Sequence, residues 1–390
     1  MTVGEPWKQI VQFTVPMLIG NIAQQLYNTV DSIVVGQYVG DNALAAVGSA
    51  APILNLLLVL FIGISMGGSI MVAQYFGAKQ REELSYTVGN CILLTAIATG
   101  IIMLLSVVLV RPLLVMLNTP ASIIDWCYSY LMMMFLGFVG CAYYNILSGV
   151  LRGLGDAFSA LVYLLVSTVL NIILDLLFVA KLGMGVSGVA WATIIAQAVS
   201  AVLCFIRMAK LTDIFDLKLH YMKYNKKFSG KIIKLGLPSG LTQAIFSMAM
   251  IVVQSLTNSF GEMFISANVI VMRVDGFAML PNFSFGSAMT TYAGQNVGAR
   301  KYERVIRGAK QGTLVAVLTT ATLTALILIF GKPLMGIFTN TMELVDLSRD
   351  MMGIIAAGYV AMAVTQSLSG VMRGAGDTMT PMWISLFTTV

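Results

Sequence analysis

Long apolar segments without charge are the feature of this sequence that most restricts its fold. Six of them exceed the roughly 20 residues that a helix needs to cross the hydrocarbon core of a membrane. They are residues 84–110, 126–151, 182–206, 235–261, 311–331 and 351–372. Four more segments of similar length, three of them interrupted by charge, are residues 9–40, 42–78, 157–180 and 263–299. Nothing alternates as the strands of a barrel do, so we predict an all-α polytopic membrane protein with ten complete spans.

The composition and the distribution of charge agree with a membrane protein. Only 10% of the 390 residues are charged, against about a quarter in soluble domains. The net charge of +6 indicates topology rather than nucleic-acid binding, because 18 of the 23 basic residues fall on the side of the membrane that holds the N-terminus. The positive-inside rule then predicts a multi-pass protein of the cell (inner) membrane with a cytoplasmic N-terminus. The four cysteines form no CxxC motif and no Cys/His cluster, so we expect no structural metal and no cofactor.

An internal repeat divides the chain. LSGVLRGLGD at 147–156 matches LSGVMRGAGD at 368–377 in eight of ten positions, an offset of 221 residues. The offset predicts two parallel six-helix repeats around a central cavity. Because the second repeat runs only 13 residues past Asp377, we expect it to lack its last one to two helices. The predicted domains are an N-terminal bundle (1–209), a basic cytoplasmic linker (210–230) and a C-terminal bundle (231–390).

Polar residues follow one side of the first predicted span. Asn21, Gln24, Asn28 and Asp31 are spaced by three, four and three residues, which places them along one face of a helix. Hydrogen bonding between helices explains the amides. A carboxylate deep in a span must be protonated, ion-paired or bound to a cation, so we interpret Asp31 as a site for a coupling ion.

Other spans carry further candidates. Asn171 and Asp175 lie one helical turn apart, so both side chains can address one point, and Thr193 lies in the next span. Two carboxylates with amide and hydroxyl oxygens suit a small cation, and they suit a shared proton equally well. A structural pair held by hydrogen bonds is the alternative.

Arg273 and Asp275 interrupt a span of the second half, where the first half has Pro52 and Leu54 at the repeat offset. Two residues apart on a helix, they do not face one another, so we expect each to have a partner elsewhere. They either lock this helix to a neighbour or supply a second carboxylate for cationic substrates, with Arg273 tuning it.

Several features together give the whole chain a resemblance to a known family. They are the first helix with Pro16 and Asp31, the two RGxGD turns, the GAK and GAR loops and the two halves. With these features the chain resembles the multidrug and toxic compound extrusion (MATE) transporters. The resemblance implies two helical bundles around a central cavity, and export of cationic or amphipathic compounds against a sodium or proton gradient. It also implies a hinge at Pro16, although a static kink is an equal alternative.

The resemblance assigns residues to roles. In the branch with its cation site in the N-terminal bundle, a first-helix aspartate neighbours an Asn-x-x-x-Asp pair and a threonine, which Asp31, Asn171, Asp175 and Thr193 match. We add Asn28 to this H⁺ or Na⁺ site. To the substrate cavity we assign Gln24, Tyr27, Arg273 and Asp275.

The predicted function is a secondary antiporter that exports organic, cationic and amphipathic compounds in exchange for H⁺ or Na⁺. Its partners are small organic substrates and the lipid bilayer, without nucleic acid, and we expect a monomer. A lipid-linked oligosaccharide flippase of the same superfamily is the alternative, although three Asp and one Arg within the spans weigh against the cationic cavity that it needs. We expect no enzyme, because the spans contain no HExxH or DDxxD motif and no histidine.

Overall fold

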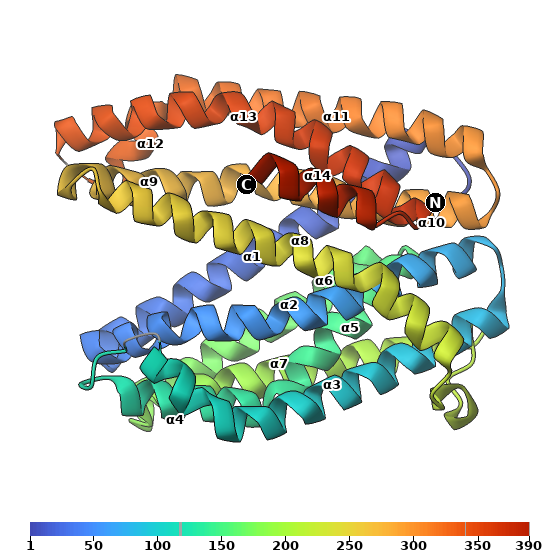
Figure 1. Ribbon diagram of the computed structural model, residues 1–390, viewed down its shortest axis with the longest axis horizontal. Coiled ribbons are helices and arrows are strands. Elements are labelled where there is room, and N and C mark those ends of the chain that lie inside the picture. Colours follow the sequence, from blue (N-terminus) through green and yellow to red (C-terminus); the bar gives the residue numbers. More distant parts are fainter. Residues whose placement is uncertain (117–118, 340, 390) are drawn as a thin grey trace. The chain divides into compact units, whose positions relative to one another are not determined.

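The computed structural model describes residues 1–116, 119–339 and 341–389, and all regular structure in these ranges is helical (Figure 1). In the first half the helices are α1 (Pro6–Tyr38), α2 (Asp41–Gly77), α3 (Arg81–Met116), α4 (Ile124–Leu136), α5 (Phe138–Leu154), α6 (Ala157–Asp175), the π-helix η1 (Leu176–Lys181) and α7 (Gly185–Ala209). The later elements are the 3₁₀-helix η2 (Leu219–Met222), α8 (Lys226–Asn258), α9 (Glu262–Ala278), α10 (Leu280–Gly298), α11 (Tyr302–Ile329), α12 (Gly331–Gly336), α13 (Met342–Ala375) and α14 (Met379–Thr389). The predicted all-α class is confirmed.

Fewer helices than the ten predicted spans meet the length and hydropathy that a membrane span requires. Within the described ranges eight helices do, or nine if α4 and α5 form one span with a bend of 52°. The bend falls at Gly137, where an added Cβ would lie 2.3 Å from the side chain of Ile194 on α7. Helix α1 has the length of a span with 33 residues but is not among these eight.

The chain packs as two compact units. Unit 1 comprises Met1–Leu18 and Leu241–Val390, and unit 2 comprises Ile19–Gly240. Helices α1 and α8 therefore each begin in one unit and continue in the other. The predicted domain boundaries, which follow the sequence repeat, stay a prediction.

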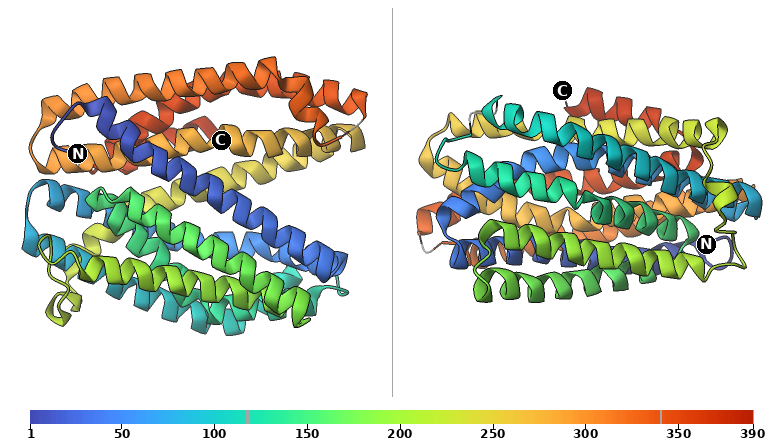
Figure 2. Two further views of the ribbon diagram at one scale, coloured as in Figure 1. Left: turned by 180° about the vertical axis from the view of Figure 1, so that it is seen from behind. Right: turned by 90° about the horizontal axis from the view of Figure 1, so that it is seen from below.

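Small residues allow close helix packing within each unit, where the long helices run side by side (Figure 2). In unit 2, a Cβ on Gly67 of α2 would lie 2.1 Å from the carbonyl oxygen of Ile232 on α8. In unit 1, a Cβ on Gly370 of α13 would lie 2.2 Å from the carbonyl oxygen of Gly286 on α10. Such backbone contacts between small residues are typical of helices that associate in membranes.

The two RGxGD turns end one helix and start the next. Gly155 and Gly376 have φ angles of +93° and +100°, which suit glycine, and they terminate α5 and α13. Asp156 then caps α6 by accepting a 3.0 Å hydrogen bond from the Ser159 amide. The same role falls to Asp377, which accepts a 3.0 Å bond from the amide of Thr380. The repeated motif is thus a structural connection.

Candidate functional site

The structure brings Asp31 of α1 together with Asn171 and Asp175 of α6, all within unit 2. Asn171 and Asp175 are fully buried, and Asp31 is half-buried. In the amide orientation that satisfies both neighbours, the Asn171 nitrogen donates to Asp31 Oδ1 at 2.9 Å and to Asp175 Oδ2 at 3.1 Å. One amide group therefore bridges the carboxyl groups of two helices.

The two carboxyl groups lie close together, because each has an oxygen within 3.1 Å of the same Asn171 nitrogen. Two ionised carboxylates held this close repel each other, which favours binding of a proton or a cation by the pair. The other oxygen of Asp175, Oδ1, is buried and has no hydrogen-bond partner among the described residues. The site thus keeps an unused lone pair of Asp175 beside the neighbouring carboxyl group of Asp31, and a proton or a small cation can use it.

Thr193 joins this region through a tyrosine. The hydroxyl of Tyr27, one helical turn before Asp31, donates to Thr193 Oγ1 at 3.1 Å. Tyr27 is buried, with 6% of its surface exposed. The structure therefore places Tyr27, which the sequence assigns to the substrate cavity, in contact with a member of the predicted cation site.

Tyr130 on α4 is a neighbour that the sequence did not single out. It is buried and belongs to a hydrophobic cluster of unit 2. No motif marks this position in the sequence.

Two predicted members of the α1 stripe have no described contact with this site. Asn28 is exposed, and none of the described contacts joins its side chain to Asp31 or Asp175. Gln24 is half-buried and likewise has no described contact with either carboxyl group. Helical spacing placed these residues on one face, but it does not determine which of them reach α6.

Local backbone geometry changes at the site. Helix α6 ends at Asp175, and the chain continues as the π-helix η1. π-helical turns are rare and frequently occur at functional sites. Asp175 therefore lies where the regular α-helical hydrogen bonding of this span is interrupted.

Asp275 of α9 belongs to a separate polar network in unit 1. The hydroxyl of Tyr359, on α13, donates to Asp275 Oδ1 at 2.8 Å and contacts Met352 Sδ at 3.3 Å. Asn282 of α10 holds the same segment, because its amide nitrogen donates to the backbone oxygen of Tyr359 at 3.3 Å. Arg273 is exposed and forms no ion pair with Asp275 in the part of the chain that the structure describes.

A cavity of about 440 Å³ in unit 1 is lined by residues of α11 and α13, among them Arg349, Asp350 and Met352, and by none of the predicted site residues. Pro16 is half-buried inside α1, three residues before Ile19, where unit 2 begins. Among the described residues, no group of three or more His, Cys, Asp and Glu side chains could hold a metal ion.

Comparisons with known proteins agree with this architecture. The family model described as MatE matches residues 16–177 and 238–390. The probable multidrug resistance protein YoeA of Bacillus subtilis is 28% identical over 388 residues, which cover 98% of this chain and 84% of that protein.

Solved structures resemble the whole chain as well. A crystal structure of MATE in the bent conformation has a TM-score of 0.92 at 25% identity, over 98% of this chain and 85% of that one. A MOP superfamily transporter from Pyrococcus furiosus has a TM-score of 0.91 at 25% identity, over 99% of this chain and 86% of that one. The reverse polarity of its binding pocket is described as suggesting a different function for that transporter.

Proposed function

Because the chain belongs to the MatE family, whose members are membrane transporters rather than enzymes, we propose that it is a multidrug efflux antiporter. It exports organic, cationic and amphipathic compounds in exchange for H⁺ or Na⁺, as a monomer in the inner membrane with a cytoplasmic N-terminus. The family relation supports the transporter class. The coupling ion and the substrate charge are proposed from the side chains.

The observation that carries the proposal is the bridge from Asn171 to Asp31 and Asp175. Binding or release of a proton or a cation here changes the net charge of the carboxyl pair that joins α1 and α6, in a region with little water. An ion that binds one conformation more tightly than another shifts the equilibrium between them by that difference in affinity. Coupling therefore follows if the geometry of this carboxyl pair differs between the inward-open and outward-open states.

Thr193 and Tyr27 are proposed to complete the ion site, and Asn28 is proposed to take part only in another conformation. The hydroxyl groups of Thr193 and Tyr27 are already paired with one another. Their oxygens can still accept a cation, because each retains a lone pair. Pro16 is proposed as the hinge of α1, since it removes one backbone hydrogen bond inside the helix.

Fold similarity does not decide the substrate, because the MATE structure and the transporter of reversed pocket polarity match the chain almost equally, with TM-scores of 0.92 and 0.91. The charges of the spans favour a cationic substrate over the anionic headgroup that a lipid-linked oligosaccharide flippase would carry. We propose Asp275, held by Tyr359, as the anchor for the substrate cation, with Arg273 of the same helix tuning it. Gln24 is proposed independently as a residue that contacts the substrate.

Proteoliposomes test the coupling. Export of a fluorescent organic cation is measured under a sodium gradient and, separately, a proton gradient, for the protein and for Asp31→Asn. We expect one gradient to drive export and Asp31→Asn to reduce that export at least about tenfold, because a hydrogen bond to a charged group contributes about 1.5–3 kcal/mol. The control is Asp213→Asn, at an exposed position between α7 and α8.

Three outcomes would count against the proposal: transport under neither gradient, transport indifferent to Asp31→Asn, or equal loss in Asp213→Asn. The substrate anchor has its own readout, because Asp275→Asn should raise the apparent KM for a cationic substrate and leave the dependence on the driving ion unchanged. If Asp275→Asn altered only the ion dependence, the anchor would be wrong.

A further inference from the structure

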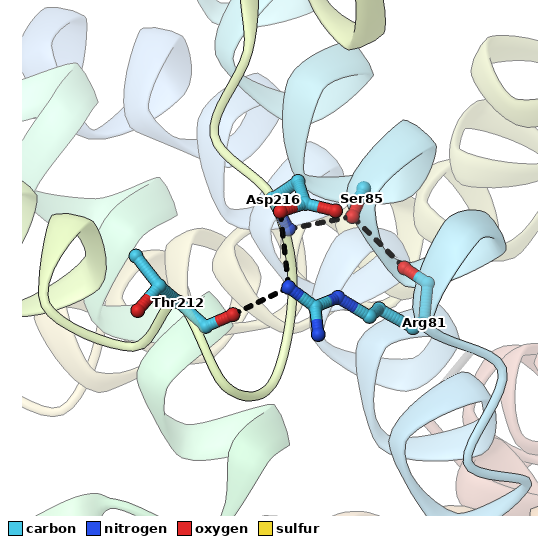
Figure 3. Close-up of polar contacts among 4 residues, drawn as sticks. All are labelled: Arg81, Ser85, Thr212 and Asp216. Atoms are coloured by element: carbon cyan, nitrogen blue, oxygen red, sulfur yellow. Dashed lines mark hydrogen bonds and ion pairs between the residues drawn. The ribbon is translucent and has the colours of Figure 1, made fainter.

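The segment between α7 and α8 is fixed to the start of α3 rather than free. Arg81 donates through Nη2 to the backbone oxygen of Thr212 at 2.6 Å and to Asp216 Oδ1 at 3.0 Å (Figure 3). The backbone amide of Asp216 donates in turn to Ser85 Oγ at 2.8 Å, one turn further along α3. Both ends of this contact lie within unit 2.

The contact continues along the same face of α3. The ring of Tyr86 stacks on Phe228 with centroids 5.3 Å apart, and its hydroxyl lies 3.1 Å from Nε2 of His220. Asn90 Oδ1 accepts from the Asn225 amide at 3.0 Å and from Ser229 Oγ at 2.7 Å. The segment is therefore held at successive turns of α3, and its side chains that face α3 are engaged in these contacts.

Close backbone approach adds to this attachment. A Cβ on Gly89 would lie 2.2 Å from the carbonyl oxygen of Tyr221, so only glycine allows the segment to lie this near to α3. Phe215 is 1% exposed and belongs to the buried core of unit 2. The segment cannot rotate to bury other side chains without breaking these contacts.

The outward side of the segment combines basic charge with large apolar side chains. Leu219 is 83% exposed and Tyr224 is 64% exposed. Between and beside them are four exposed lysines, namely Lys218, Lys223, Lys226 and Lys227. We call these six residues the linker face. The carboxylate of Asp216 is paired with Arg81 and also interacts with Lys218. The other three lysines, Lys223, Lys226 and Lys227, form no ion pair among the described residues.

We propose that the linker face docks on anionic phospholipid headgroups of the cytoplasmic leaflet. Lysines near an anionic leaflet are attracted to it, and an aromatic and an aliphatic side chain beside them can enter the boundary between headgroups and acyl chains. The charge complementarity with an anionic surface and the exposed Leu219 and Tyr224 select this occupant. The proposal rests on the proposed orientation, which puts the linker on the cytoplasmic side.

Docking would hold the starts of α3 and α8 at a defined depth. Because the inner side of the segment is fixed to α3 at Arg81 and Asn90, any attraction of the linker face to lipid is transmitted to that helix. The lysines thus act on the position of unit 2 in the membrane, and not only on a flexible connection.

A fluorescent label tests the docking. A bimane group is attached to the cysteine of Tyr224→Cys, and the protein is reconstituted into phosphatidylcholine vesicles. The vesicles are prepared with or without about 30% phosphatidylglycerol, an anionic lipid. Both kinds contain a trace of lipid brominated near the headgroup, which quenches the bimane fluorescence. The native cysteines are buried or half-buried, and the unsubstituted protein treated in the same way measures their background. We expect at least a twofold increase in quenching with the anionic lipid, which falls as salt is added.

Matched variants separate docking from general charge. The variant K218Q/K223Q/K226Q/K227Q should lose the increase in quenching that the anionic lipid causes. The control variant K79Q/R300Q/R307Q/K310Q removes four exposed charges from other connections and helix starts, and it should retain that increase. Quenching that is independent of lipid charge, or equal loss in both variants, would overturn the proposal. Quenching absent in all vesicles would also overturn it and would favour an acidic protein as the partner.

The orientation has a separate test. A membrane-impermeant thiol reagent added to intact cells should leave Tyr224→Cys unlabelled until the cells are permeabilised. Labelling of intact cells would overturn the proposed orientation and the leaflet assignment. The quenching experiment would still decide whether the linker face binds anionic lipid, so the two failures are distinguishable.

Discussion

The hydroxyl of Thr320 on α11 donates a 2.7 Å hydrogen bond to the amide oxygen of Asn282 on α10, in the core of unit 1. The repeat offset relates these residues to Thr99 and Phe61 of the first half. Thr99 is also buried, but its hydroxyl has no hydrogen-bond partner among the described residues. The two halves therefore use one position of the repeat in different ways.

The same asymmetry continues one contact further. Asn282 reaches the backbone of Tyr359, whereas Phe61 packs on Phe138, the repeat counterpart of Tyr359, with ring centroids 5.1 Å apart. An apolar aromatic pair in one half thus corresponds to a hydrogen-bonded network in the other. That network ends on Asp275, for which the first half has Leu54.

Replacing Thr320 by valine should destabilise the protein. The change keeps the shape of the side chain but leaves the buried amide oxygen of Asn282 without its donor, which costs about 1–3 kcal/mol. Thr99→Val is the matched control, because it removes a hydroxyl that has no partner, and it should be neutral or stabilising. The unfolding midpoint in detergent measures both, and equal midpoints for the two variants would contradict the role assigned to the network.

Asn171→Leu should impair transport without unfolding the protein. The leucine cannot donate to Asp31 and Asp175, and loss of a hydrogen bond to charged groups predicts a decrease of at least about tenfold in gradient-driven export. Thr29→Val, at an exposed position of α1, should retain export within about twofold, as surface changes usually do. An equal decrease in both variants would assign the effect to the polarity of the helices rather than to the bridge.

Gly67→Ala should destabilise unit 2. The new methyl group would lie 2.1 Å from the carbonyl oxygen of Ile232, and forcing α2 and α8 apart costs about 1–3 kcal/mol. Gly230→Ala in α8 has nothing within 4 Å of the added Cβ, so it should stabilise the helix by up to about 1 kcal/mol. Thermal unfolding of both variants checks the opposite signs.

Attachment of the linker to α3 should weaken in acid. The guanidinium of Arg81 holds the pKa of Asp216 below its ordinary value of 3.8. A carboxyl group whose pKa is lowered by folding contributes stability above pH 3.8, and this contribution is lost as the pH falls through the lower folded value. Hydrogen exchange of the amides around Asp216, corrected for its intrinsic pH dependence, should show faster opening below that pH.

Arg81→Gln provides the control for this acid effect. It removes the charge that lowers the pKa, so the extra opening in acid should disappear and the amides should exchange faster at all pH values. Asp213→Asn, at an exposed position on the same segment, should leave the profile unchanged. A profile that is the same with and without Arg81 would show that the ion pair does not hold the segment.

The fold class could be predicted from the sequence, because uncharged runs of sufficient length leave few alternatives. The pairing of Asn171 with Asp175 was also accessible, since residues four apart share a face of any helix. The bridge from Asn171 to Asp31 was not accessible from spacing, because it depends on the packing of α6 against α1. Only the resemblance brought these helices together.

Other features were hidden for similar reasons. The bend at Gly137 depends on Ile194, which lies 57 positions later in the sequence. The basic linker was expected to be a cytoplasmic connection, and its charge gave no sign that Phe215 and Phe228 would be buried. Tertiary contacts of this kind leave no local periodicity.

Membership of α1 in two units has a consequence for biosynthesis. Its first turns belong to unit 1, where Ile10 is fully buried beside Gly312 of α11. During translation, these residues leave the ribosome long before α11 exists. Unit 2 can assemble once Gly240 has been synthesised, whereas the start of α1 must wait in the membrane for partners made about three hundred residues later. The beginning of the chain is thus among the last parts to reach its final packing.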